Sequence, residues 1–180
     1  MTETLTSHAP ATTTTADEPW RLGGFLPYRL SIASNAVSSL IAERYRNRFG
    51  LKIPEWRVMA VLGDAEGSSG ANGSSGGGAL TQRDLTEATL MDKVAVNRAC
   101  KVLEARGLIA RAANEADGRS HLLELTREGR DVHAEIKPLA LATEAELFED
   151  FTPEEQAEVK SLLKRLHDRA MVLSQGSPKT

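Results

Sequence analysis

Asn97 and Arg98 are neighbours in the segment "DKVAVNRACKVLEARG", whose apolar residues recur at helical spacing. An asparagine amide can form two hydrogen bonds with adenine, and an arginine guanidinium can form two with guanine. On a helix, both side chains would point away from Val96 and Cys100, which belong to the apolar stripe. The pair therefore predicts a helix face that reads the edges of nucleic-acid bases; the alternative is a face that is only solvated.

Basic residues surround this pair, although the whole chain has a net charge of -3. Between residues 93 and 130, eight Lys and Arg outnumber five Asp and Glu, so this segment carries +3 and the rest of the chain -6. Such a segment can contact phosphates, which gives affinity without sequence information. The further candidates for nucleic-acid contacts lie on the same predicted helix and at the start of the one before it: Gln82, Arg83, Lys93 and Lys101.

The elements that must position these residues follow one another along the chain. Apolar residues at steps of three and four predict a long helix that stops at Gly50, and Pro54 suits the first turn of a second helix. Thr81 and Asp92 can cap two short helices, near residues 82–88 and 93–106. The runs "LIARAAN" and "RSHLLELT" predict two strands around the turn "EADG".

Two further helices are expected after the strands. One covers residues 127–149, where Pro138 would bend or interrupt it, and the other begins at the capping box "TPEE", residues 152–155. A short helix, a tight turn, a second helix and a hairpin together predict a winged helix-turn-helix. The expected fold is therefore mainly α with a small β-hairpin wing.

The stretch "GSSGANGSSGGG", residues 67–78, has the composition of a flexible linker. The two short helices bury little by themselves, so they need the preceding helix, from Pro54 to Leu62, to close a three-helix core. The stretch then falls inside that core unit, which predicts an enlarged surface loop over residues 63–79 rather than a domain boundary. Doubling the length of a loop costs only about 0.6 kcal/mol.

From roughly residue 25 to residue 173 the chain resembles the MarR family of bacterial transcription regulators. The motif that carries the resemblance runs from "LTQRDL" through the recognition helix to "DGRSHLLELTREG". The resemblance implies an obligate homodimer built by interlocking dimerisation helices (residues 25–50 and 127–173), and a winged helix-turn-helix (residues 54–126) that reads a palindromic operator in double-stranded DNA. It also implies that Arg119 enters the minor groove, braced by Asp117. Asp117 could instead only shape the turn. The family usually has Thr where this chain has Ala95, so no contact is implied there.

The resemblance further implies a small-molecule effector, bound between the dimer helices and the winged domain, that weakens DNA binding. The resemblance implies that this effector is an aromatic acid or a phenolic. The run "FLPYRLSIASNAVS" resembles regulators of aromatic-acid catabolism, some of which sense an aromatic acyl-CoA. A tryptophan at the position of Trp56 is more often core than a pocket wall, and which of Arg29, Arg44 or Arg57 faces the cavity stays open. The candidates for the pocket are Arg29, Ser34, Asn35, Ser38, Trp56, Arg57 and Met59.

Nothing in the sequence predicts an enzyme, a cofactor or a bound metal. The glycine-rich stretch is not followed by Lys-Ser or Lys-Thr, the single Cys100 lies in a buried stripe without a positioned histidine, and the four histidines lack metal-ligand spacing. The main hypothesis is thus a ligand-responsive DNA-binding repressor. The alternative is a helical dimeric adaptor whose degenerate winged domain binds protein, although such an adaptor would not need Arg98 and Arg119.

One domain is expected, over residues 19–174, between a Thr-rich tail of residues 1–18 and a short tail of residues 175–180. The Thr-rich tail has one large aliphatic residue, Leu5, and is expected to be disordered. No apolar run reaches the length of a membrane span and no secretory signal is visible. With only one cysteine in the chain, these features predict a cytoplasmic protein.

Overall fold

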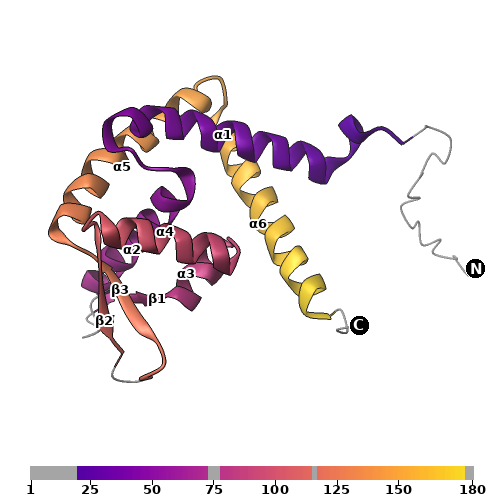
Figure 1. The fold of residues 1–180 in the computed structure, drawn as a ribbon. Helices are drawn as coiled ribbons and strands as arrows, with labels where there is room; N and C mark the ends of the chain where they lie inside the picture. The colour runs from indigo at the N-terminus through magenta and orange to yellow at the C-terminus, as the bar shows by residue number, and fades with distance from the viewer. Residues whose placement is uncertain (1–19, 73–77, 115–116, 177–180) are drawn as a thin grey trace, which may run out of the picture. The chain divides into compact units, whose positions relative to one another are not determined.

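The computed structural model describes residues 20–72, 78–114 and 117–176 (Figure 1). The Thr-rich tail, residues 73–77 of the glycine-rich stretch and residues 177–180 lie outside this part. The elements are the 3-10 turn η1 (Leu22–Gly24), the helices α1 (Leu26–Phe49), α2 (Ile53–Asn72), α3 (Gln82–Thr89), α4 (Lys93–Ala105), α5 (Arg127–Leu147) and α6 (Pro153–Gly176), and the strands β1 (Leu80–Thr81), β2 (Ile109–Ala113) and β3 (His121–Leu125). The predicted fold class, mainly α with a small β wing, is confirmed.

Three helices form the core that the sequence predicts. α2, α3 and α4 pack against one another, and α2 and α4 also pack against the sheet. Each contributes a fully buried leucine, namely Leu62, Leu85 and Leu103, and Leu123 of β3 closes the core from the sheet side. The two short helices are therefore stabilised by burial against α2 rather than by their own length.

The sheet has three antiparallel strands in the order β1-β3-β2. β2 and β3 form the expected hairpin, in which Arg111 pairs with Leu123 and Ala113 with His121. β1 was not expected, because a strand of two residues leaves no periodicity to detect. Its Leu80 pairs with Leu123, which ties the chain entering α3 to the wing.

Helix α2 is longer than the sequence predicts. The helix was expected to end near Gly63 and to give way to a loop over residues 63–79, but α2 continues to Asn72. The expectation was wrong because Gly63 is not a stop signal: a Cβ there would lie 2.5 Å from Cε1 of His133. Glycine at this position permits the close approach of α5.

The predicted caps and stops of the other helices are confirmed. Thr81 and Asp92 cap α3 and α4 through their side chains. Gly50, directly after α1, has a φ of 62°, a left-handed conformation that favours glycine. Pro138 lies within α5, which continues past it, so this helix is not interrupted.

The chain divides within α1 into two units, and the second begins at Ser38. In the first, Leu26 of α1 exposes 71% of its surface and Leu30 exposes 38%. In the second, Leu162 and Leu166 of α6 expose about half of theirs. Both units thus carry apolar helix faces that the single chain leaves in solvent. No helix in the described ranges is long and apolar enough to cross a membrane.

Candidate nucleic-acid interface

Helix α4 turns one face to the core and the other to solvent, as its apolar spacing predicts. The buried face consists of Val96, Ala99, Cys100 and Leu103. On the outer side Lys93, Arg98 and Lys101 are exposed, and Asn97 is half-buried. The side chains expected to read bases therefore lie on the accessible side of this helix.

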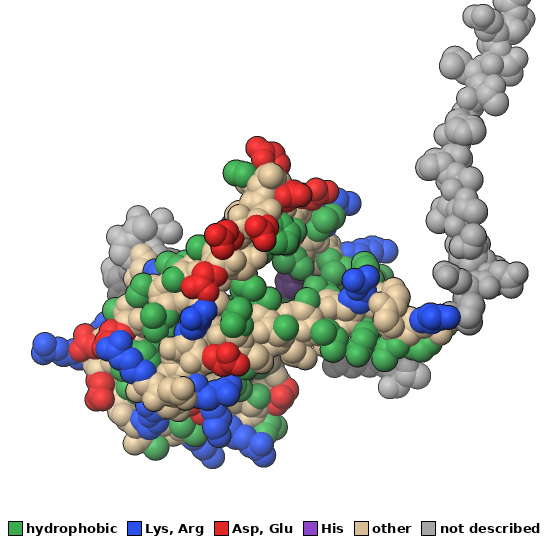
Figure 2. Space-filling view, turned by 90° about the horizontal axis from the view of Figure 1, so that it is seen from above, with side chains coloured by type: hydrophobic (Ala, Val, Ile, Leu, Met, Phe, Trp, Pro, Cys, Tyr) green, Lys and Arg blue, Asp and Glu red, His purple; other side chains and the backbone are tan. Residues whose placement is uncertain are grey.

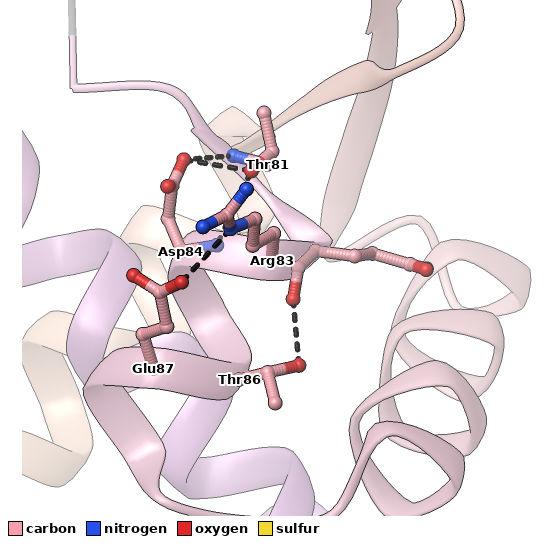
Figure 3. Close-up of polar contacts among 6 residues, drawn as sticks. Thr81, Arg83, Asp84, Thr86 and Glu87 are labelled. Carbon is pink, nitrogen blue, oxygen red and sulfur yellow. Dashed lines mark hydrogen bonds and ion pairs between the residues drawn. The ribbon is translucent and has the colours of Figure 1, made fainter. Parts of the chain in front are cut away.

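The N-termini of α3 and α4 are fixed by their caps. Thr81 and Asp84 form a capping box, in which the Thr81 hydroxyl accepts the Asp84 N–H at 3.2 Å and the Thr81 N–H donates to the Asp84 carboxylate at 2.8 Å (Figure 3). The Asp92 carboxylate accepts the N–H of Ala95 at 2.8 Å. Each cap satisfies an amide that the helix itself leaves free, so both helix starts are held in place.

Four of the five predicted DNA-binding cations have no side-chain partner in the described part of the chain. With the described residues, the side chains of Lys93, Arg98, Lys101 and Arg119 form no hydrogen bond or ion pair. Other arginines of the same region are engaged: Arg83 with Glu87, Arg111 with Glu104, and Arg130 with Glu66. A bound anion could therefore meet the four free cations without first displacing a carboxylate.

A cleft of about 600 Å³ lies between α3, the start of α4 and the wing. It brings together five of the predicted DNA-binding residues, Gln82, Arg83, Lys93, Asp117 and Arg119. Asn97, Arg98 and Lys101 are not among its lining residues and belong to the outer face of α4. The predicted set thus divides between a cleft and an adjoining helix face.

Arg111 and His121 also line this cleft, and the sequence did not single them out. Arg111 joins β2 to α4, since its guanidinium donates to both carboxylate oxygens of Glu104, at 2.9 and 3.0 Å. The hydrogen bonds from Arg111 lower the pKa of Glu104 and keep it charged. His121 stands opposite Ala113 in the hairpin register, and no pattern within a single strand indicates that pairing.

The turn of the wing is held by side chains around Asp117. Its carboxylate accepts the backbone N–H of Arg119 at 3.1 Å, and its carbonyl accepts the N–H of Ser120 at 2.9 Å. The Asn114 amide donates to the Ser120 hydroxyl at 2.8 Å. In the free chain Asp117 therefore shapes the turn that presents Arg119, and its bond is to the backbone of Arg119 rather than to the guanidinium.

Gln82 was expected near a phosphate, yet its amide points toward the neighbouring helix. Its Nε2 donates to Oδ1 of Asn97 at 3.5 Å, the long end of a hydrogen bond. The contact favours the orientation of the Asn97 amide in which Oδ1 faces Gln82 and the Nδ2 donor points away from it. Gln82 is thus placed to position Asn97.

The predicted effector-pocket residues fall in two groups. Arg29, Ser34 and Asn35 are exposed residues of the first unit. In the second unit, Arg57 donates to the hydroxyl of Ser38 at 3.2 Å.

Met59 is fully buried in the core, so the expectation that it offers surface to a ligand is wrong for this structure. Met59 lies on the side of α2 that packs into the core, together with Val58 and Leu62.

Trp56 is half-buried between α2 and α5. Its ring stacks on that of His133, with 5.6 Å between centroids and 25° between planes, and it meets Tyr45 at 5.7 Å. Trp56 also lines a small cavity of about 180 Å³, together with Asp64, His133 and Lys137. Burial lowers the pKa of His133, and the charge of Lys137 lowers it further. Trp56 therefore serves as core on one side and as a cavity wall on the other.

Charge on the surface is segregated as it is along the sequence. In Figure 2, Lys and Arg side chains gather along the lower border of the view, whereas Asp and Glu side chains gather around the projection at its top. This separation leaves one part of the surface suited to a polyanion.

A three-helix core followed by a β-hairpin, with free cations on the second short helix and on the hairpin, defines a winged helix-turn-helix protein. A family model described as MarR family matches residues 49–120. This part of the chain is therefore similar to the MarR family of transcriptional regulators.

Known proteins of this kind are similar to the chain over most of its length. An HTH-type transcriptional repressor of Mycobacterium tuberculosis, Rv2887, is 26% identical over 144 residues, which cover 79% of this chain and 91% of the repressor. The MarR family regulator SPO1453 of Silicibacter pomeroyi has a TM-score of 0.67 at 28% identity, covering 84% and 99% of the two chains. BpsR of Bordetella bronchiseptica, whose DNA binding is regulated by 6-hydroxynicotinic acid, has a TM-score of 0.69 at 24% identity, covering 84% and 99%.

Proposed function

We propose that this chain is a repressor that binds a palindromic operator in double-stranded DNA. Helix α4 lies in the major groove, where Asn97 and Arg98 meet base edges, and Arg119 of the wing enters the adjacent minor groove. Lys93 and Lys101 contact phosphates. The observation that carries the proposal is that four of the five cations predicted to bind DNA have no partner among the described residues, namely Lys93, Arg98, Lys101 and Arg119. The fifth, Arg83, is paired with Glu87.

The DNA-binding form is a homodimer, in which two copies of α4 face two half-sites. The proposal is supported by the apolar side chains that α1 and α6 expose in the single chain, such as Leu26 and Leu166. Burying them against a second copy removes this surface from water, which is the main driving force for association. A two-fold dimer requires half-sites about one helical turn apart, roughly 10 base pairs.

The effector of this repressor is a small aromatic acid, a phenolic or an aromatic acyl-CoA that releases the operator. BpsR, whose DNA binding responds to an aromatic acid, has the same fold. In this chain Trp56 of α2 offers a ring face at a cavity between α2 and α5, and Arg57 of α2 donates to the hydroxyl of Ser38 on α1. Arg29, Ser34 and Asn35 remain proposed members of the pocket.

Binding of the full chain to the DNA upstream of its own gene tests the proposal. Fluorescence anisotropy would be measured over a series of salt concentrations, with a scrambled duplex of equal length as control. We expect specific binding. The logarithm of its association constant should fall linearly with the logarithm of the salt concentration, with a slope of about -0.9 for each phosphate neutralised. Equal binding of both duplexes, or no binding at low salt, would contradict a repressor and favour the protein-binding adaptor. Addition of salicylate or benzoate then tests release.

A further inference from the structure

Val94 is an apolar residue on the part of α4 that faces solvent. It lies in the first turn of the helix and exposes 57% of its surface. A helix rotates by about 100° per residue, which puts Val94 opposite the buried stripe of Val96, Ala99, Cys100 and Leu103. It therefore occupies the middle of the outer face.

The neighbours of Val94 on this face are the two side chains expected at base edges. Residues three and four positions apart are adjacent on a helix surface, so Val94 adjoins Asn97 and Arg98. In the described residues Val94 is neither a member of the core nor packed against it. A β-branched residue also forms helices less readily than alanine. Neither packing nor helix propensity in the free chain accounts for a valine here.

The major groove offers one group that an isopropyl side chain can recognise. Thymine alone among the four bases carries a methyl group there, and the polar atoms on the major-groove edges of the other bases are hydrogen-bond donors and acceptors. A valine pressed against such an atom would deprive it of water without replacing the hydrogen bond, which is unfavourable. The first turn of a recognition helix is the part that reaches base edges.

We propose that Val94 reads the C5-methyl group of one thymine in each half-site, next to the base pairs contacted by Asn97 and Arg98. This inference rests on the proposed operator binding. It adds an apolar specificity determinant to a surface that is otherwise polar and cationic.

The test removes the methyl group from the DNA and the isopropyl group from the protein. A duplex is first selected from a randomised library by the full-length wild-type chain. Each of its thymines is then replaced by deoxyuridine, which lacks only the methyl group. At one thymine per half-site we expect the wild type to lose about fourfold in affinity, the value of one buried methyl group, and about 15-fold when both half-sites are changed. Val94→Ala should bind the two duplexes almost equally.

Val102→Ala is the matched control, because Val102 is also exposed on α4 but lies two turns further along, away from the first turn. It should keep the wild-type preference for thymine over deoxyuridine. Melting temperatures of both variants should match the wild type, and Val94→Ser repeats the comparison if Val94→Ala fails to fold. An unchanged preference in the Val94 variants would overturn the inference while leaving operator binding intact. A wild type that selects no duplex would instead overturn the proposed function, and this inference with it.

Discussion

Gly63 of α2 lies directly against the imidazole of His133 on α5. A Cβ built at Gly63 would be 2.5 Å from Cε1 and 2.6 Å from Nε2 of that ring, closer than any ordinary contact. His133 in turn stacks on Trp56, which limits its freedom to move away. The missing side chain at position 63 thus sets how closely α2 and α5 approach.

Gly63→Ala should therefore destabilise the protein, although alanine is the better helix former. Overpacking of this kind costs about 1–3 kcal/mol, whereas alanine gains about 1 kcal/mol over glycine in a helix interior. The free energy of unfolding, measured with urea, should fall relative to wild type. Removing the ring in the double variant Gly63→Ala/His133→Ala should relieve the clash, and the two substitutions should couple.

Gly67→Ala is the matched control on the same helix. A Cβ at Gly67 would meet nothing within 4 Å, and its φ is not positive. Only the helix-propensity gain remains, so this variant should be as stable as wild type or slightly more stable. Equal losses for Gly63→Ala and Gly67→Ala would show that the contact with His133 is not the cause.

The rest of the glycine-rich stretch should be dispensable. Gly78 packs against the backbone of Glu66, where its Cβ would lie 2.5 Å from Cα, so the chain leaves α2 and returns to nearly the same place. Deleting residues 67–77 retains Gly78 and the ion pair between Glu66 and Arg130. We expect the melting temperature and the operator affinity to stay close to wild type, because loop length enters the entropy only logarithmically. A large loss of operator affinity at unchanged stability would show that the stretch touches DNA or the partner subunit.

The sequence predicted those features that depend on neighbours along the chain. Caps such as Thr81 and Asp92 and the outward position of Arg98 follow from local spacing, and the structure confirms them. The end of α2 was predicted wrongly because the reason for Gly63 lies in α5, far along the chain. Local pattern alone treats a glycine as a stop.

In the candidate site, too, the features that the sequence did not predict depend on residues far apart along the chain. The ion pair between Glu104 and Arg111 and the position of His121 depend on how β2 pairs with β3 and packs on α4. Met59 was placed in a pocket because the family resemblance puts the effector against the first and second helices. α2 packs against α3, α4, α5 and β3, so little of its circumference is free.

Cys100 should be inert in the folded protein. Burial raises the pKa of its thiol to about 11, and the thiol is fully enclosed by the core. Because the thiolate is the reactive form, a raised pKa and poor access both suppress reaction at pH 8. Ellman's reagent should label the native chain very slowly and react with one thiol per chain in denaturant, since Cys100 is the sole cysteine. Rapid labelling of the native chain would show that the core around α4 opens readily.

Substituting Arg98 and substituting Arg119 should weaken operator binding in different ways. Arg98→Ala should cost about 1–3 kcal/mol and relax the base preference at one position of each half-site, because it removes a contact with a base edge. Arg119→Ala should also weaken binding, but the loss should follow the A·T content beside each half-site, since a narrow minor groove attracts the guanidinium. Each substitution occurs twice in a symmetric dimer. The total loss of binding free energy for each variant should therefore be nearly twice the loss from one contact.

Binding of both variants to an operator library at fixed salt separates these effects, with Arg83→Ala as the comparison. Arg83 is exposed and already paired with Glu87 at 2.9 Å, so its loss should weaken binding less and without any change in base preference. If Arg98→Ala and Arg119→Ala lose affinity uniformly across all sequences, both arginines contact phosphates and the base-reading assignment is wrong. If neither variant loses affinity, the free cations of α4 and the wing serve another purpose, and the protein-binding adaptor becomes the better account of this fold.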